Sequence, residues 1–464
     1  MFVKVSLFIR IFLPLARVNF SFYNGGMLKT KDPAVFKLIK AEEKRQKEVL
    51  EMIPSENYAS KEVLEALGTV LNNKYSEGYP KKRYYQGNAV ADEVEILTQE
   101  RAKSLFKVPF VNVQALSGSA MNLAVYFALL EPLKGKIMGL SLAFGGHLTH
   151  GQPQSISGKF FKSTLYTLSK DGRLDYDAIE KQAMLEKPDI IVCGFTAYPQ
   201  IIDFAKFAEI ADKVGAYLLA DISHIAGLVV AGAHPSPVPY AHIVTTTTHK
   251  TLRGPRGALI MVTDKGLQKD PDLAKKIDTA IIPGIQGGPH DNQTAAIAVA
   301  LKEASTPSFK KYGAQIVKNS QKLAEELTKY GFDLVSGSSE NHLILIDLRN
   351  KGVSGKVAAL ALEVAGIVLN MNGVPFDTNP PLWPSGIRLG TPAITTRGMK
   401  EAEMVKIAKW MNEVIEEVKH YQLPQDKEAR KEFMQKFRTE IVKNKQLLQI
   451  AKEVKNLCQN YRIY

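Results

Sequence analysis

Short apolar runs that alternate with helix-like stretches after residue 90 constrain the fold more than any other feature of the sequence. Three such runs cover residues 190–193, 217–220 and 243–246. Strands that alternate with helices are typical of parallel strands joined by helical crossovers. The sequence therefore predicts an α/β fold with a mostly parallel central sheet.

The length of the chain and a change in its apolar rhythm predict more than one domain. Single hydrophobic cores stop growing near 250–300 residues, and this chain has 464. A helix is expected from Asp32 to Val49, and a longer one from about Phe309 to Tyr330, ahead of strands at 343–347 and 387–389. We expect an N-terminal extension (1–31), an arm (32–85), a large domain (86–305), a small α/β domain (306–418) and a basic, helical C-terminal extension (419–464).

The net charge of +13 lies at the two ends of the chain. Residues 1–31 hold five basic residues and no acid, and residues 419–464 hold 11 basic and 5 acidic residues. The rest of the chain is close to neutral, so its charge gives no reason to expect a polyanionic partner for the main domains. A nucleic-acid-binding protein that acts through these basic tails is kept as an alternative.

The N-terminal segment and the cysteines bear on the cellular location. Arg10 and Pro14 interrupt the first 26 residues, so neither apolar piece reaches the roughly 18–20 residues of a membrane span. The segment is either an organelle transit peptide or untranslated, with Met27 as the start, and we favour the second. Cys193 and Cys458 form no C-x-x-C pair, which fits a reducing, cytoplasmic location. An organelle is the alternative.

Lys250 is the sharpest candidate for chemistry. It follows the run Thr245–His249 and precedes the glycine-rich stretch 253–257. A lysine near a strand end, among small hydroxyls and glycines, suits a site where the amine stays accessible and partly deprotonated. Taken alone, a solvated loop lysine is the alternative.

Two further segments could complete a site around Lys250. Asp221 ends an apolar run, and an acid at the carboxyl end of a parallel strand faces the ligand crevice of an α/β fold. Ser117, Gly118 and Ser119 precede a helix-like stretch at 121–130, where amides and hydroxyls could receive a phosphate. Alone, either segment could be an ordinary helix cap. Together with Lys250, Asp221 resembles the acid of pyridoxal-phosphate (PLP) enzymes, which pairs with the ring nitrogen.

Six segments in this order resemble serine hydroxymethyltransferase over about residues 32–418. They are Ser55–Asn57, Asn73–Pro80 with Arg83–Tyr85, Gly145–Gly151, the Lys250 segment, Gln286–Pro289 and Ser385–Pro392. The resemblance implies an aspartate-aminotransferase-like (fold type I) PLP enzyme and a compact, bacterial-type homodimer with shared active sites. The implied reaction turns serine and tetrahydrofolate reversibly into glycine and 5,10-methylene-tetrahydrofolate, without a metal ion.

The resemblance also implies a role for each cofactor residue. Lys250 would bind PLP as a Schiff base, Asp221 would contact the ring nitrogen, and His147 would stack on the ring. His224 and Thr196 would approach the ring hydroxyl or neighbouring atoms. The phosphate would be held by Ser117, Gly118, Ser119 and His249 of one subunit, with Tyr75, Gly287 and Gly288 of the other.

The substrate residues follow from the same resemblance. Arg388 would bind the serine carboxylate with two hydrogen bonds, assisted by Ser55. Glu77 would transfer protons, with Tyr85 nearby and Arg256 organising this corner. Leu142, Gly146, Leu148 and Asn372 resemble pterin contacts.

Some positions depart from the family pattern. Thr196 stands where serine is common, Phe144 where histidine is, and Met371 where lysine is. Lys81 and Gln86 stand where glycines are expected. Since this loop helps form the folate entrance, the departures bear on folate affinity more than on cofactor chemistry.

An alternative function and the role of the C-terminal segment also follow from the sequence. The nearest alternative function is a folate-independent aldolase for threonine-like substrates, against which Asn372, Leu148 and Glu77 argue. The segment after residue 418 should add one or two amphipathic helices as a solvated or dimer-packing appendage.

Overall fold

The computed structural model describes residues 26–424 and 426–464, and the described chain divides after residue 43 into two compact units. The first unit contains α1 (Gly26–Lys31) and most of α2 (Pro33–Glu48), the helix expected from Asp32 to Val49. The predictions for residues 1–25 lie outside the described residues. No helix in the described ranges is long and apolar enough to cross a membrane.

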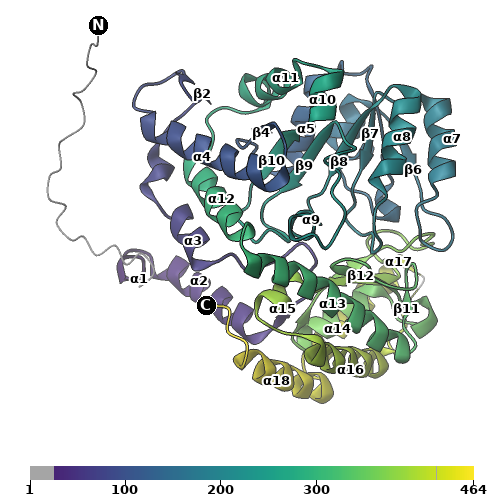
Figure 1. Ribbon diagram of the computed structural model, residues 1–464. Coiled ribbons are helices and arrows are strands. Elements are labelled where there is room, and N and C mark those ends of the chain that lie inside the picture. Colours follow the sequence, from purple (N-terminus) through teal and green to yellow (C-terminus); the bar gives the residue numbers. More distant parts are fainter. Residues whose placement is uncertain (1–25, 425) are drawn as a thin grey trace, which may run out of the picture. The chain divides into compact units, whose positions relative to one another are not determined.

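The second unit contains a seven-stranded sheet with helices on both of its faces (Figure 1). Its strand order is β4-β10-β9-β8-β7-β5-β6. The five strands from β9 to β6 run parallel, and β10 runs antiparallel to both of its neighbours. The mostly parallel sheet expected from the sequence is confirmed. The strands are β4 (Phe110–Asn112), β5 (Lys136–Leu140), β6 (Lys162–Tyr166), β7 (Ile190–Cys193), β8 (Tyr217–Asp221), β9 (Ile243–Thr247) and β10 (Ala258–Val262).

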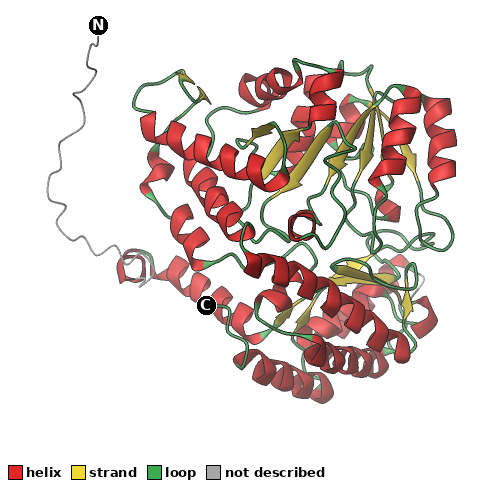
Figure 2. Cartoon of the chain, viewed as in Figure 1, coloured by secondary structure: helices red, strands yellow, loops and turns green. Residues whose placement is uncertain are grey.

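Alternate residues of these strands enter two different cores, because successive side chains of a strand point to opposite faces. Ile190 and Val192 pack on the face covered by α5 (Gly118–Leu129) and α11 (Leu273–Thr279). Ile191 and Cys193 pack on the other face. Helices before and after them in the chain cover that face (Figure 2). Those helices are α4 (Ala89–Phe106), α7 (Tyr176–Glu186), α8 (Phe204–Val214), α9 (Ala226–Ala231) and α12 (Asp291–Ala304).

A second sheet of order β11-β12-β15-β14 lies in the C-terminal part and is antiparallel throughout. The sequence predicted α/β structure here, and the strands at 343–347 and 387–389 are present. The strands are β11 (Asp333–Leu334), β12 (Leu343–Asp347), β14 (Asn370–Asn372) and β15 (Gly386–Gly390), and β1 (Leu50–Glu51) pairs separately with β13 (Ile367–Val368).

The boundary expected at residue 305 does not separate two cores. The helix α13 (Pro307–Lys329) places Phe309 and Ile316 in the core of the large sheet, whereas Leu323 and Leu327 enter the core of the small one. A helix of 23 residues is long enough to serve both.

The C-terminal segment also differs from the solvated or dimer-packing appendage that we expected. It forms α17 (Lys427–Ile441) and α18 (Lys445–Gln459), which contact α14 (Gly355–Val364); α18 also contacts α16 (Glu401–Val418). Phe437, Ile441 and Val454 are buried in the small-domain core. The segment therefore completes that core, because α14 and α16 would otherwise expose an apolar surface.

The remaining elements are short and connect these layers. They are α3 (Lys61–Leu67), β2 (Gly78–Tyr79), β3 (Lys82–Arg83), α6 (Ile156–Phe160), α10 (Asp264–Lys269), α15 (Pro392–Thr396), the short helices Val70–Asn73, Leu142–Phe144 and Arg349–Lys351, and the π-helical turn Ala280–Ile285.

Candidate active site

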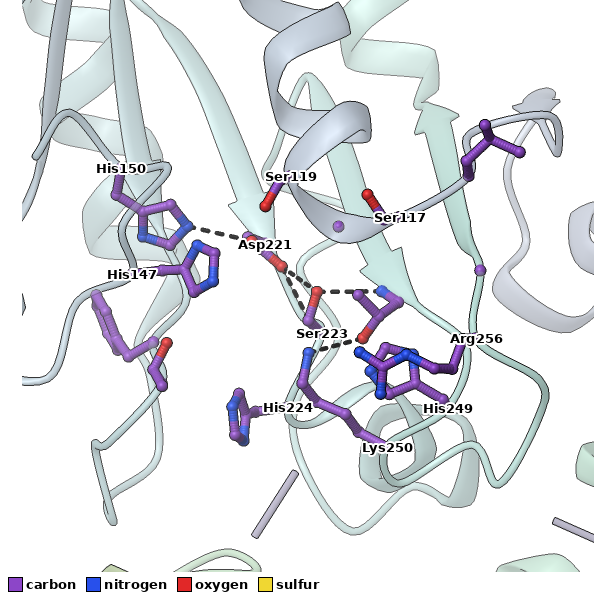
Figure 3. Close-up of a pocket in the computed structure, with 16 residues that line it drawn as sticks. Ser117, Ser119, His147, His150, Asp221, Ser223, His224, His249, Lys250 and Arg256 are labelled. Carbon is purple, nitrogen blue, oxygen red and sulfur yellow. Dashed lines mark hydrogen bonds and ion pairs between the residues drawn. The ribbon is translucent and has the colours of Figure 1, made fainter. Parts of the chain in front are cut away.

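A cavity of about 210 Å³ lies at the carboxyl ends of β8 and β9, as expected for a ligand site in an α/β fold. Figure 3 shows side chains from four separate segments turned toward it. Its lining consists of Leu116, Ser117, Gly118, Ser119, His147, His150, Phe195, Thr196, Asp221, Ser223, His224, Thr247, His249, Lys250, Arg256 and Gly257.

Asp221 is a buried carboxylate that its neighbours keep charged. Its Oδ2 accepts hydrogen bonds from Asn122 at 2.8 Å and pairs with Nε2 of His150 at 3.1 Å, and its Oδ1 accepts from Ser223 Oγ at 2.5 Å. Burial alone would raise the pKa of Asp221, but these contacts hold it well below its ordinary value. Gly194, with a φ of +103°, lets the backbone pass Asp221, because a Cβ there would collide with the Asp221 carbonyl oxygen.

Lys250 lies in the same cavity. Its Nζ donates to Thr247 Oγ1 at 2.9 Å (Figure 3). The backbone carbonyl oxygen of Lys250 accepts a hydrogen bond from Asn57 Nδ2 at 2.9 Å. Burial lowers the pKa of Lys250 from 10.5 to about 8, although the charge of Asp221 opposes this shift. A substantial fraction of the amine is therefore neutral near pH 8 and able to attack a carbonyl carbon.

The start of α5 forms one wall of the cavity. Ser117 is the N-cap of α5 and its side chain accepts from Ala120 N, so the helix begins at the cavity. A Cβ at Gly118 would lie 2.7 Å from Thr247 Cγ2, which shows how closely the helix start approaches β9. With Ser119, His249 and Arg256 in the same lining, this wall offers hydroxyls, amide N–H groups and a cation to an anionic group.

Two histidines of the lining, His147 and His249, are neutral. Burial lowers the pKa of His147 to about 4 and that of His249 to about 3. The Nδ1 of His147 accepts from the backbone N–H of Thr149 at 3.2 Å, so its proton is on Nε2. These rings present flat, uncharged faces and single donors to a ligand.

Arg388 is a buried guanidinium next to the cavity. Its Nη1 donates to the carbonyl oxygen of Thr196 at 2.7 Å, and its Nε donates to Asn370 Oδ1 at 3.1 Å. Burial lowers the pKa of Arg388 from 12.5 to about 10, and no carboxylate of the described residues contacts it. A buried cation without a counter-ion is suited to an anionic ligand.

Residues 52–57 lie beside the end of β15, the strand that carries Arg388. Gly390 at the end of β15 donates to Met52 O at 2.8 Å, which brings the segment that carries Ser55 beside the strand of Arg388. Ser55 is half-buried and does not line the cavity.

Five predicted site residues form a separate cluster within the chain. Tyr75 OH donates to Glu77 Oε1 at 3.1 Å, and the rings of Tyr75 and Tyr85 meet edge to face at 5.4 Å. Gly287 and Gly288 lie against this cluster. Tyr75 and Tyr85 are 56% and 49% exposed, and none of the five lines the cavity of Lys250.

The predicted pterin contacts lie in two segments of the chain, residues 142–148 and the strand β14. Leu142 and Leu148 are exposed, Gly146 is buried, and Asn372 ends β14. Phe144, where the family pattern has histidine, contacts the ring of Phe376 edge to face at 5.1 Å. The short helix that contains Leu142 thus contacts, through an aromatic pair, the segment that follows β14. Lys81, at a position expected to be glycine, has a φ of +64°, the conformation that glycine adopts most readily.

These residues fit the PLP expected from the sequence. An amine, a carboxylate that stays charged and a helix start rich in donors face one cavity, and these are the groups that an aldehyde, a pyridine nitrogen and a phosphate require.

Sequence reasoning assigned no role to several contacting residues, among them His150, Asn122, Asn370 and His342. His150 belongs to the glycine-rich motif 145–151, which could have suggested it. Asn122 and His342 contact their partners across 99 and 118 residues of sequence, and no local pattern signals such contacts.

Comparisons with known proteins agree on one family. A model described as serine hydroxymethyltransferase matches residues 28–411. A protein named serine hydroxymethyltransferase from Desulfotalea psychrophila is 55% identical over 388 residues, which is 84% of this chain and 89% of the relative. Proteins of the same name from Acidothermus cellulolyticus and Bartonella henselae are 55% and 52% identical, over 83% and 85% of this chain and 89% of each relative.

Proposed function

The chain belongs to the serine hydroxymethyltransferase family, and we propose from that premise which of its residues carry each part of the reaction. It is a PLP-dependent transferase that interconverts serine and tetrahydrofolate with glycine, 5,10-methylene-tetrahydrofolate and water.

Lys250 holds the cofactor through its amine, which burial makes partly neutral. When bound, PLP supplies an electron sink for the bond that breaks between Cα and Cβ of serine. Asp221 remains charged and keeps a proton on the ring nitrogen, and His147 covers the ring face. His224 and Thr196, which line the same cavity, would contact the ring hydroxyl or neighbouring atoms. The phosphate is held by Ser117, Gly118, Ser119 and His249.

Arg388 binds the serine carboxylate, with Ser55 assisting. Its contacts with Thr196 and Asn370 fix the plane of the guanidinium, so that its remaining N–H groups can form a two-pronged contact. A lysine could not reproduce this geometry.

Glu77 transfers the proton of the serine hydroxyl and of the one-carbon unit, supported by Tyr85 and Arg256. Leu142, Gly146, Leu148 and Asn372 contact the pterin. Glu77 holds a hydrogen bond to Tyr75, which supports a defined orientation for its carboxylate.

The active enzyme is a homodimer with shared sites, located in the cytoplasm. The exposed cluster of Tyr75, Glu77, Tyr85, Gly287 and Gly288 reaches into the cavity of a second copy. Its separation from the cavity of its own chain supports this arrangement. Both cysteines are free buried thiols, which suits a reducing compartment.

One observation carries these assignments: a buried amine and a buried carboxylate face a single cavity that the start of α5 also lines. The purified protein should show the visible absorption of lysine-bound PLP, and glycine should change this spectrum more strongly when tetrahydrofolate is present. Lys250→Ala should lose the lysine-bound absorption, whereas Lys134→Ala, at an exposed position, should retain it. Absence of PLP absorption from the parent protein would contradict the cofactor assignments, and serine cleavage that needs no folate would favour the aldolase.

A further inference from the structure

His342 and His224 form a hydrogen bond at the wall of the cavity. Nε2 of His342 lies 3.2 Å from Nδ1 of His224, and the ring centroids are 5.4 Å apart. His342 directly precedes β12 of the small sheet, while His224 follows β8 and lines the cavity of Lys250. We propose, on the basis of the proposed function, that His342 is a positioning residue that holds the His224 ring with an N–H toward the cofactor.

The distance requires one proton between the two rings. Two bare nitrogens at 3.2 Å would repel each other, and two N–H groups would clash. Both rings are neutral, because burial lowers the pKa of His342 to about 3 and that of His224 well below its ordinary value. Either His342 donates from Nε2 to Nδ1 of His224, or His224 donates in the opposite direction.

The surroundings of His342 favour the first arrangement. Its Nδ1 is buried and has no hydrogen-bond partner. If His224 donated to Nε2, this Nδ1 would carry an N–H without an acceptor, and orphaned buried donors are rarer than orphaned acceptors.

This arrangement fixes what His224 offers to a ligand. With its Nδ1 accepting from His342, its proton is on Nε2. Within the described residues Nε2 of His224 has no hydrogen-bond partner, and the side chain is turned toward the cavity (Figure 3). The free N–H can therefore donate to an oxygen of the bound cofactor, and a donor there stabilises the deprotonated form of a ring hydroxyl.

Backbone hydrogen bonds next to the start of β12 fix the position of His342. His342 O accepts from Thr391 N at 3.0 Å, and β12 pairs with β15, where Leu345 lies opposite Arg388. His342 is fully buried and His224 is 5% exposed. The same sheet thus carries both the guanidinium next to the cavity and the ring that orients His224.

Two variants separate this role from a loss of packing. His342→Phe keeps a flat ring without a polar atom, whereas the amide nitrogen of His342→Gln can still donate to His224. Freeing the His224 ring means that the cofactor must order it on binding, so the Kd for PLP should rise about three- to tenfold in H342F. The Kd of H342Q should stay within about twofold of the parent value.

The spectrum of bound PLP supplies a readout that packing alone does not move. In H342F the pH at which the visible band changes should shift upward, since the ring oxygen loses a donor, and H342Q should keep the parent value. His242→Phe is the matched control, because His242 is also buried and loses one hydrogen bond, from Leu218 N at 2.9 Å, without lining the cavity. It should leave both readouts unchanged.

Nitrogen NMR of the apo-protein with labelled histidine tests the tautomers directly. His224 and His342 should each show an N–H at Nε2 and a bare Nδ1. An N–H at Nδ1 of His224 would overturn the inference, as would equal loss of unfolding midpoint in H342F and H342Q with unchanged PLP binding. If the parent protein bound no PLP, the proposed function itself would fail.

Discussion

Two buried ionisable side chains in one cavity depend on different contacts for their charge. Lys250 has one hydroxyl partner for its amine and is buried, so its pKa falls to about 8. Asp221 is more deeply buried but has three polar partners, which more than compensate for burial. The chain thereby places a partly neutral amine near a carboxylate that stays charged.

The pH dependence of PLP capture should report the pKa of Lys250. Only the neutral amine attacks an aldehyde, so the capture rate of the apo-protein should rise as pH increases from 6 and level off above about 8. Stopped-flow absorbance with excess PLP measures this rate.

A free lysine side chain is the reference for that profile. Its amine, with a pKa near 10.4, should react faster with each step up to pH 9, without a plateau. A protein profile that followed this reference would show that Lys250 is not shifted as the structure indicates.

The sequence could predict the residues of the site that belong to local motifs. Asp221 ends the apolar strand β8, Lys250 follows the end of β9, and both line the cavity. The roles of Asn370 and His342 could not be predicted. Asn370 contacts Arg388 on the neighbouring strand, and His342 contacts His224 of the large domain. Such contacts depend on packing and register, which single-sequence patterns do not encode.

At the scale of elements, α5 combines a structural and a binding task. Ser117 caps its first turn, with Ala120 N 3.4 Å from Ser117 Oγ, and the same residue lines the cavity. Ser354 caps α14 in the same way, with Val357 N at 3.3 Å, but lies outside the cavity lining. The two serines therefore allow capping and binding to be separated.

Ser117→Ala and Ser354→Ala should both lower the free energy of unfolding by about 1 kcal/mol, because each removes an N-cap. Only S117A should also raise the Kd for PLP, by about five- to tenfold, since it removes a donor to the phosphate. Urea unfolding and fluorescence titration measure the two effects. Equal PLP affinity in the two variants would argue against a phosphate role for Ser117.

Element types were predictable where the apolar pattern is strong. The runs at 190–193, 217–220 and 243–246 form β7, β8 and β9, and the long helix near 309–330 forms α13. The antiparallel direction of β10 was not predictable, because a buried apolar strand has the same pattern in either direction. Nor could the pattern of α17 and α18 show which surface their apolar faces cover.

At the scale of the whole molecule, that surface is the small-domain core. Phe437 of α17 is 1% exposed, so Phe437→Ala should lower the free energy of unfolding of the apo-protein by about 3–5 kcal/mol. Val442→Ala, at a position 53% exposed, should change it by less than about 0.5 kcal/mol. Similar unfolding midpoints for both variants would mean that the C-terminal helices do not stabilise this core.

The shared site of the proposed dimer can be tested by complementation between two inactive variants. Lys250→Ala removes the cofactor lysine, and Glu77→Gln removes the proton-transfer group from the exposed cluster. If Glu77 acts in the cavity of the second copy, a mixed dimer has one site with both Lys250 and Glu77 intact and one site with neither. Unfolding and refolding an equal mixture should restore about one quarter of the parent activity, because half of the dimers are mixed.

If each site used only residues of its own chain, the same mixture would recover a different activity. If Glu77 served the cavity of its own chain, every site in a mixed dimer would lack either Lys250 or Glu77, and activity would stay at the level of the separate variants. Mixing without refolding is the control, since subunits that do not exchange cannot complement. Recovery only after refolding would therefore assign Glu77 to the site of the other subunit, and with it the exposed cluster of Tyr75 and Tyr85 that surrounds it.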